Sequence, residues 1–409
     1  MMLRVLKKIG SGEKIWIARR YKVSKNYLTL SKSCPMDRGH IRFNLIEPSI
    51  KKNNMKNLAT LLLCVFLIEN CSLGRIVNWS ENQKLYYVDD DFKFEVVDHR
   101  VILRDSSNLA YILDIGGSNA FFCDVPDDLA IIDSAEFGVL FLAGGERSKK
   151  KTYLIDSFSL NFFQGKDMPF TLIPSQIIPE CYSIDGMIGS NSFEQKMLML
   201  NFSDNVLSVR DSFDVSQFVE LKVINLDLYD VFKVEVEING VKVNVKLDTG
   251  TPTGVVLNKR NFKSITMDKK IVELFHLKDE IYFSSGVCSL GDGLIDSIVC
   301  VRHSRVKDNL LGVDYMKRYN WILDYKNEKV FVQPSSLSND LLSTKTFQFR
   351  AEDGGLYLVA STTKNDKRFF NKKVLSVDGK RVLKDNYCMV LDRINNCRDW
   401  HSLNIVFED

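Results

Sequence analysis

Short apolar or alternating segments follow one another along residues 75–340, and polar turns separate them. These segments predict β-strands at Phe92–Val97, Val101–Leu103, Leu109–Leu113, Val139–Leu142, Val231–Ile238 and Val241–Leu247. Asn239-Gly240, between the last two, is a strong signal for a tight hairpin turn. Many short strands with few long helical periods indicate a mainly β protein built of barrels or sandwiches.

Part of this pattern occurs twice, 123 residues apart. Residues 185–201 and 308–324 each carry an apolar pair and a glycine (Gly189 or Gly312), then a predicted short amphipathic helix, then an apolar strand ending in Asn or Asp. Upstream of each, a strand runs into an Asp-x-Gly sequence, at Asp114 and at Asp248. We interpret the two copies as a duplication that gives two lobes, 75–215 and 216–336, each with one aspartate loop.

Residues 345–409 form a third predicted unit after the polar linker Pro334–Asp340. Asp378-Gly379 between two apolar segments predicts a strand, a tight turn and a second strand. A helix over Asn386–Arg393 and a closing strand over Ser402–Phe407 complete the expected unit.

The net charge of +3 is unevenly distributed along the 409 residues. Residues 1–54 contain 13 Lys/Arg and 3 Asp/Glu, so the remainder is acidic, with 42 against 49. Because nucleic-acid binding requires a basic face, an acidic body argues against a nucleic-acid partner. The 45% hydrophobic content allows a large core.

A basic start at Met55 and an uncharged run over 58–68 resemble a secretory signal. We therefore interpret 55–74 as a signal segment and 1–54 as a non-native N-terminal extension. The apolar run is too short for a comfortable membrane span of about 20 residues; a buried helix or strand is the structural alternative. Cys71 stands where a lipoprotein signal places its lipidated cysteine, while cleavage near Ser72–Gly74 and an uncleaved anchor remain open. The protein is expected to be exported to the periplasm or to the cell envelope as a membrane-anchored protein.

Six cysteines follow Cys71, and an exported chain can use an even number for disulfides. Cys288–Cys300 and Cys388–Cys397 are the pairs nearest in sequence, and six buried free thiols are the favoured alternative. No cysteine and histidine cluster has zinc-ligand spacing, so no metal or other cofactor is expected.

The second lobe resembles the retropepsin-like aspartic peptidases of bacteria. The residues that carry the resemblance are Lys246-Leu-Asp248-Thr249-Gly250-Thr251, then Leu310-Leu311-Gly312, then Trp321-Ile-Leu-Asp324. It covers about 85–335 and implies a two-lobed acid-protease barrel fold in which Asp114 and Asp248 are the catalytic pair. In this family two carboxyl groups share a proton, because their negative charges repel each other, and together they activate a water. The supporting loop residues implied are Gly116, Ser118, Thr249, Gly250, Thr251, Gly189 and Gly312.

The first loop departs from the family pattern, because Ile115 stands where Thr or Ser is usual. The resemblance implies that a threonine hydroxyl bonds across the lobes, and isoleucine cannot replace it. The expected function is that of an aspartic endopeptidase acting on a peptide or protein substrate, with both lobes in one chain and therefore as a monomer. A catalytically inactive, peptide-binding lipoprotein and a purely structural surface lipoprotein are the alternatives.

Two hairpins and the C-terminal unit complete the predictions from resemblance. Lys149–Lys151 is expected at the solvated tip of a hairpin, which in the family closes over the substrate, and Phe283–Val287 with Leu290–Val301 would form its counterpart. Residues 371–382 resemble the strand-turn-strand of PDZ domains, which bind an extended peptide as an added strand. The carboxylate-binding loop of that family is not evident, and a structural appendage is the alternative.

Overall fold

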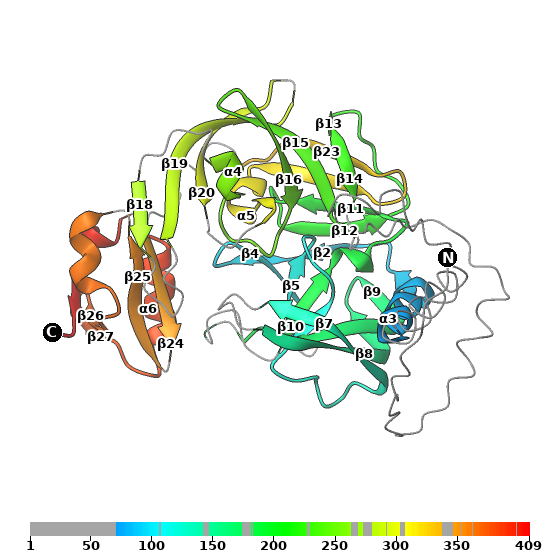
Figure 1. Cartoon of the computed structure of the whole chain (residues 1–409), viewed down its shortest axis with the longest axis horizontal. Helices are drawn as coiled ribbons and strands as arrows, with labels where there is room; N and C mark the ends of the chain where they lie inside the picture. The colour runs from blue at the N-terminus through cyan, green and yellow to red at the C-terminus, as the bar shows by residue number, and fades with distance from the viewer. Residues whose placement is uncertain are drawn as a thin grey trace, which may run out of the picture. The chain divides into compact units, whose positions relative to one another are not determined.

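The computed structural model describes residues 71–409, except for 106–107, 142–146, 174–180, 182, 227–229, 263–268, 273–279, 292, 303–306, 338–346, 353, 362 and 398. The predicted extension 1–54 and the apolar run of the predicted signal lie outside the described residues. Within them the chain is mainly β, as predicted (Figure 1). None of the described helices has the length and apolar character needed to cross a bilayer.

The first lobe is built on one large sheet with the order β3-β4-β5-β10-β6-β9-β8-β7, and β1 pairs with β9. Its strands are β1 (Lys84–Tyr87), β3 (Glu95–Val97), β4 (Arg100–Arg104), β5 (Ala110–Asp114), β6 (Ala120–Phe122), β7 (Ile131–Phe141), β8 (Arg147–Leu160), β9 (Phe163–Ile173) and β10 (Gly186–Gly189).

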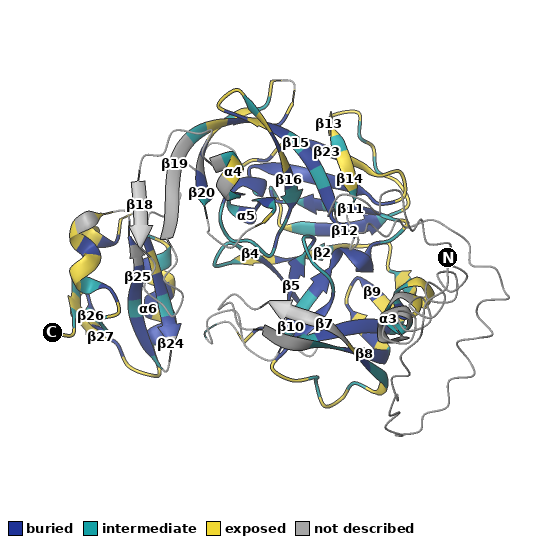
Figure 2. Cartoon of the chain, viewed as in Figure 1, coloured by how far each residue is buried: buried dark blue, intermediate teal, exposed yellow. Residues whose placement is uncertain are grey.

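Strand β5 shows why part of this sheet is apolar at successive positions. Side chains alternate between the two faces of a strand. Tyr111 and Leu113 lie in the main core, whereas Ala110 and Ile112 lie in a second apolar cluster on the other face. Both faces of β5 are therefore covered, and Figure 2 shows this strand as mostly buried.

The second lobe is a sheet whose strands follow the order β14-β15-β16-β21-β17-β20-β19-β18, and a further β15–β19 pairing nearly closes it into a barrel. The strands are β14 (Val223–Leu226), β15 (Phe232–Ile238), β16 (Val241–Leu247), β17 (Val255–Leu257), β18 (Lys269–Val272), β19 (Glu280–Ser289), β20 (Ile295–Arg302) and β21 (Asn309–Leu311). The predicted turn between β15 and β16 is confirmed, since Asn239 and Gly240 both have positive φ, at 49° and 79°.

A third sheet joins the two lobes, with the order β13-β23-β22-β11-β12-β2. Its strands are β2 (Asp91–Lys93), β11 (Met197–Asn201), β12 (Val206–Arg210), β13 (Val219–Leu221), β22 (Tyr319–Asp324) and β23 (Lys329–Pro334). At its centre β11 pairs antiparallel with β22, and Met199 faces Ile322. These two residues are 123 positions apart, so equivalent residues of the repeat meet at a local two-fold axis.

Helices are few and short among the described residues of the two lobes. They are α3 (Cys71–Asn82), the short 3-10 helix η3 (Ser190–Ser192), α4 (Lys259–Phe262) and α5 (Val313–Met316). The amphipathic helices predicted for the repeat are thus reduced to η3 and α5. Trp79 of α3 packs on the first lobe against Ala135 and Leu154.

The C-terminal part has its own apolar core. Its elements are β24 (Phe347–Glu352), β25 (Gly355–Ser361), η4 (Lys364–Phe369), β26 (Val374–Val377), β27 (Lys380–Arg381), α6 (Tyr387–Asn395), η5 (Trp400–Ser402) and β28 (Ile405–Phe407). The predicted turn is confirmed by the positive φ of Asp378 and Gly379 between β26 and β27. The predicted helix is α6, and β28 covers the end of the predicted closing strand.

The predicted cysteine pairs are wrong, because Cys181 forms a disulfide with Cys388, 207 residues later. Its Cα atoms are 5.1 Å apart. Cys288 and Cys300 are buried thiols, and the β19–β20 register places each opposite another residue. The favoured alternative of six buried free thiols is also wrong, since Cys123 is exposed. Spacing along the chain could not reveal a pairing between two parts so far apart.

The position predicted for Lys149–Lys151 is wrong as well. These residues lie inside β8, where Lys149 pairs with Val139 and Lys151 with Glu136. Residues 142–146, between β7 and β8 in the sequence, lie outside the described residues. The predicted hairpin of the second lobe exists as β19 and β20, and its role over a substrate stays a prediction.

Candidate active site

The two Asp-x-Gly loops leave equivalent strands of the two lobes. Asp114 is the last residue of β5, and Asp248 follows β16. In each lobe a parallel strand lies beside the loop: β10 aligns Gly189 with Asp114, and β21 aligns Leu311 with Leu247. The backbone N–H of Asp248 donates to the carbonyl of Leu311 at 3.0 Å. Ladder bonds therefore fix both aspartates at the ends of strands.

The structure brings the two carboxyl groups together, and the glycine of each loop covers the carboxyl group of the other. A Cβ atom at Gly116 would lie 2.6 Å from Cγ of Asp248, and one at Gly250 would lie 2.7 Å from Cγ of Asp114. Both distances are too short for any side chain. Glycine is thus required at both positions so that the loops can approach each other.

The two carboxyl groups have unequal hydrogen-bond partners. Asp248 accepts from Thr251 twice, from its backbone N–H and from its hydroxyl, both at 2.9 Å. Asp114 accepts from the backbone N–H of Gly116 at 2.9 Å, and Gly117 stands where the second loop has Thr251. Since hydrogen bonds to the charged form favour ionisation, Asp248 is the better site for the negative charge and Asp114 for the proton.

Burial governs the protonation of this pair. Loss of solvent raises the pKa of both carboxyl groups, and the negative charge of Asp248 raises the pKa of Asp114 further. Hydrogen bonds from Thr251 oppose the increase at Asp248. The pair therefore retains a proton at a pH where a free aspartate has lost it, and its two steps belong to the pair as a whole.

Thr249 connects the loops across the lobes. Its buried hydroxyl donates to the carbonyl oxygen of Leu113 at 2.5 Å and accepts from the backbone N–H of Ile115 at 3.0 Å. Ile115 itself is 1% exposed and packs in the main core. The cross-lobe support is therefore made by the second loop, and the isoleucine contributes packing in its place.

We expect Thr249→Val to lower the free energy of unfolding by about 2–4 kcal/mol, because valine leaves one buried carbonyl and one buried N–H without a partner. Thr249→Ser is the matched control, since it keeps the hydroxyl. Urea unfolding followed by fluorescence measures both. Equal losses in the two variants would mean that the methyl group, and not the hydrogen bonds, supports the loops.

The other predicted loop residues, Gly189, Gly312 and Ser118, lie around the two aspartate loops. A Cβ atom at Gly189 would lie 2.6 Å from the carbonyl oxygen of Gly117, and one at Gly312 would lie 2.5 Å from that of Thr251. Both glycines therefore allow the strand behind each loop to approach it. Ser118 is half-buried, and among the described residues its side chain makes no hydrogen bond to the aspartates.

Sequence reasoning missed the buried asparagines that hold the first loop. Oδ1 of Asn119 accepts from the backbone N–H of Gly189 at 2.7 Å and from the hydroxyl of Ser192 at 2.9 Å. In the second lobe the buried Asn309 at the start of β21 bonds to Asn258 and Asn244, which is a different place from that of Asn119. Asn119 follows Ser118 and Asn309 follows Asp308, so no surrounding apolar stretch in the sequence signalled that either asparagine is buried.

A pocket of about 180 Å³ opens beside the two aspartates. Ile112 and Met187 contribute apolar surface, Gly250 and Thr251 contribute the second loop, and Arg100 contributes a positive charge. Sequence reasoning missed Arg100 because its place depends on how β4 pairs with β5.

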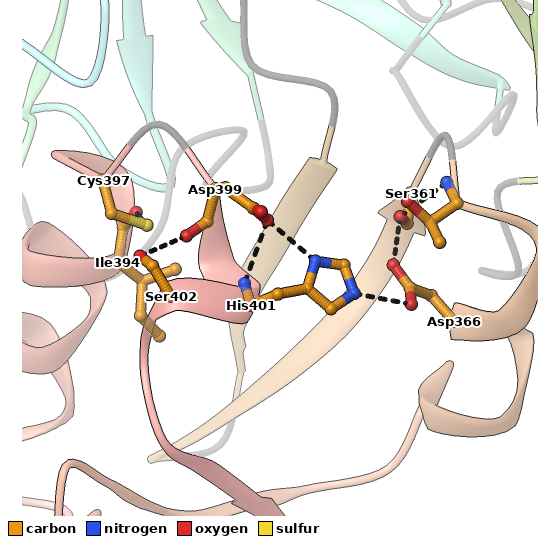
Figure 3. A network of polar contacts seen from close by, with 8 residues as sticks. Ser361, Asp366, Ile394, Cys397, Asp399, His401 and Ser402 are labelled. Atoms are coloured by element: carbon orange, nitrogen blue, oxygen red, sulfur yellow. Dashed lines mark hydrogen bonds and ion pairs between the residues drawn. The ribbon is translucent and has the colours of Figure 1, made fainter.

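A second polar network lies wholly in the C-terminal part (Figure 3). His401 contacts Asp399 through Nδ1 at 2.7 Å and the buried Asp366 through Nε2 at 2.9 Å, and Ser361 donates to Asp366 at 2.5 Å. Although desolvation opposes it, these carboxylates raise the pKa of His401. The serine bonds to the carboxylate rather than to the histidine, so the arrangement is not that of a nucleophile and its base. The network instead links η5 to β25 and η4.

The remaining predicted features give no further site. Among the described residues, no cluster of histidine, cysteine or carboxylate side chains could hold a metal ion. Cys71 is the first residue of α3, and its predicted lipidation stays a prediction.

Comparisons with known proteins add little. No family model and no curated protein matches the chain. A solved structure titled "Crystal structure of edgp" is similar at 10% sequence identity and a TM-score of 0.39, over 63% of this chain and 96% of that one. A likeness at that level carries no argument.

Proposed function

We propose that this chain hydrolyses peptide bonds as an aspartic-type endopeptidase. The observation that carries the proposal is the pair formed by Asp114 and Asp248, with each carboxyl group covered by the glycine of the opposite loop. Two such groups supply a base and an acid without a metal or a covalent nucleophile. This agrees with the predicted resemblance to the retropepsin-like peptidases.

The unequal hydrogen bonding suggests how the roles divide. Asp248, with its two bonds from Thr251, accepts a proton from a water held between the carboxyl groups. Asp114 holds the shared proton and donates it toward the substrate carbonyl oxygen as the water attacks. When the C–N bond breaks, Asp248 gives this proton to the leaving amine nitrogen, and a hydroxyl group of the tetrahedral intermediate returns a proton to Asp114, so the pair again holds one proton.

Other features bear on the oligomeric state, the location and the substrate that we propose for this protein. Both aspartates belong to one chain, which is consistent with a monomer. The Cys181–Cys388 disulfide favours an oxidising, extracytoplasmic location, in line with the predicted signal and the predicted anchor at Cys71. We propose an extended peptide as the substrate, and peptide capture by the PDZ-like C-terminal part remains part of the proposal.

The test is hydrolysis of a diverse peptide pool by the purified protein from acidic to neutral pH. Because burial raises both pKa values, the singly protonated pair should persist above the pKa of about 3.9 of a free aspartate. We expect a bell-shaped profile: activity falls at low pH when both groups are protonated and at high pH when both are ionised. A statine-type inhibitor should abolish the cleavage.

Ile115 favours a second candidate function, an inactive protein that binds peptides in the same cleft. Its buried apolar side chain replaces one half of the cross-lobe support. Saturable peptide binding by a folded sample that cleaves nothing between pH 3 and pH 8 would favour this alternative over hydrolysis.

A further inference from the structure

We infer that Arg100 binds a carboxylate of the substrate in the pocket beside the aspartate pair, so that the site prefers an acidic peptide. This inference rests on the proposed peptide-binding cleft. Arg100 would be the residue that selects the substrate, and acidic peptides would be the class that it selects.

Strand pairing places Arg100 on the correct face of the sheet. In the β4–β5 ladder Ile102 faces Ile112. Continuing this antiparallel register by two residues brings Arg100 opposite Asp114. Directly opposite residues project from the same face of a sheet, and Arg100 and Asp114 accordingly line the same pocket.

The guanidinium group of Arg100 is held in place, but only one of its nitrogens donates hydrogen bonds to the described residues. Nη1 donates to the carbonyl oxygen of Asp98 at 3.1 Å and to its Oδ2 at 2.7 Å. Every side-chain hydrogen bond of Arg100 with the described residues is made by this one nitrogen. The remaining N–H groups form an edge that matches the two oxygens of a carboxylate.

Asp98 is itself fixed by the turn that carries it. Asp98 and His99 both have positive φ, at 46° and 56°, in the two-residue turn between β3 and β4. His99 contacts Asp314 of the second lobe at 3.1 Å. Oδ1 of Asp98 accepts from Asn395 of α6 at 3.2 Å. Contacts from three parts of the chain thus hold the arginine. Binding a ligand therefore costs little free energy for ordering this side chain.

The surroundings of Arg100 strengthen such a contact. Its side chain is 14% exposed, and Ile112 and Met187 form the apolar wall nearby. An ion pair gains strength where water is largely excluded. The shared proton limits the charge on the aspartate pair to one, which weakens the pair's repulsion of an acidic group. The pocket is small beside the roughly 300–1,000 Å³ of typical ligand sites, which suits one side chain.

The experiment compares capped peptides that differ by Glu or Gln at one position, scanned through each position around the cleavage site. We expect one position at which Glu exceeds Gln by about 10–100-fold in kcat/KM, as for a charged hydrogen bond in a protected site. In Arg100→Gln this ratio should fall to about 1. Arg104→Gln, on the same strand and paired with Glu95 away from the pocket, removes the same charge and should leave the ratio unchanged.

Binding of the same peptides, measured by fluorescence anisotropy, separates this inference from the proposed activity. If nothing is cleaved but the Glu peptide binds more tightly and Arg100→Gln removes the difference, the carboxylate site stands and the peptidase proposal fails. If peptides are cleaved or bound with no Glu preference at any position, or none is bound, the inference about Arg100 is wrong. Thermal unfolding of both variants checks that each remains folded.

Discussion

Asp248→Asn is expected to reduce peptide hydrolysis at least about 1,000-fold while the protein remains folded. Asparagine keeps the shape of the side chain, so the bonds from Thr251 can partly persist. It cannot accept the proton of the attacking water. Asp114→Asn should have an effect of similar size, because the two groups act as one unit. Initial rates at the optimal pH measure both.

Asp211→Asn is the matched control, since this carboxyl group is exposed and bonds to Lys196. It should retain full activity. Wild-type rates in Asp248→Asn would show that the cleavage comes from another site or from a contaminating peptidase, and the proposed mechanism would fail.

The same substitution should change how stability depends on pH. The folded-state pKa values of Asp114 and Asp248 are raised above those of the unfolded chain. The folded state therefore binds more protons, and stability is lost as pH rises from about 4 through the folded-state values. In Asp248→Asn this loss should be smaller. Urea unfolding at several pH values measures the slope of the free energy of unfolding against pH. This measurement needs no substrate.

Removal of the Cys181–Cys388 disulfide should produce the largest loss of stability. The bond closes a loop of 207 residues, for which the chain-entropy account gives about 5 kcal/mol. Cys388 lies in α6, which also carries Asn395, the partner of Asp98. We therefore expect the double variant Cys181→Ser/Cys388→Ser to unfold its C-terminal part at a lower urea concentration and to bind acidic peptides less selectively.

Cys123→Ser is the matched control, because this cysteine is exposed and lies outside the disulfide. Its unfolding should not change. Peptide mapping without reductant should recover Cys181 and Cys388 in one linked fragment. Two separate alkylated fragments from the native protein, or equal stability of the double variant and the wild type, would contradict the prediction.

Local chemistry allowed much of the fold to be predicted from the sequence. The turns at Asn239-Gly240 and Asp378-Gly379 depend on residues that tolerate positive φ, and both occur where expected. The alternation in Phe232–Ile238 matches a strand with one face buried. The repeat of apolar pairs before Gly189 and Gly312 gave two parallel strands in equivalent places, β10 and β21. These features depend on neighbours within a few residues, or on a second copy of the same pattern.

What the sequence by itself determined is the mainly β class, the positions of most strands and the identity of the two Asp-x-Gly loops. The tertiary structure alone decided which groups meet there. It joined Cys181 to Cys388, placed Arg100 and Asp114 in one pocket, and gave Asp248 a hydroxyl partner that Asp114 lacks among the described residues. The first depends on residues 207 positions apart, the second on how two neighbouring strands pair, and the third on a loop closing upon itself. Pairing preferences over such distances are set by the packing of whole sheets, which leaves no periodic or compositional signal at the residues concerned.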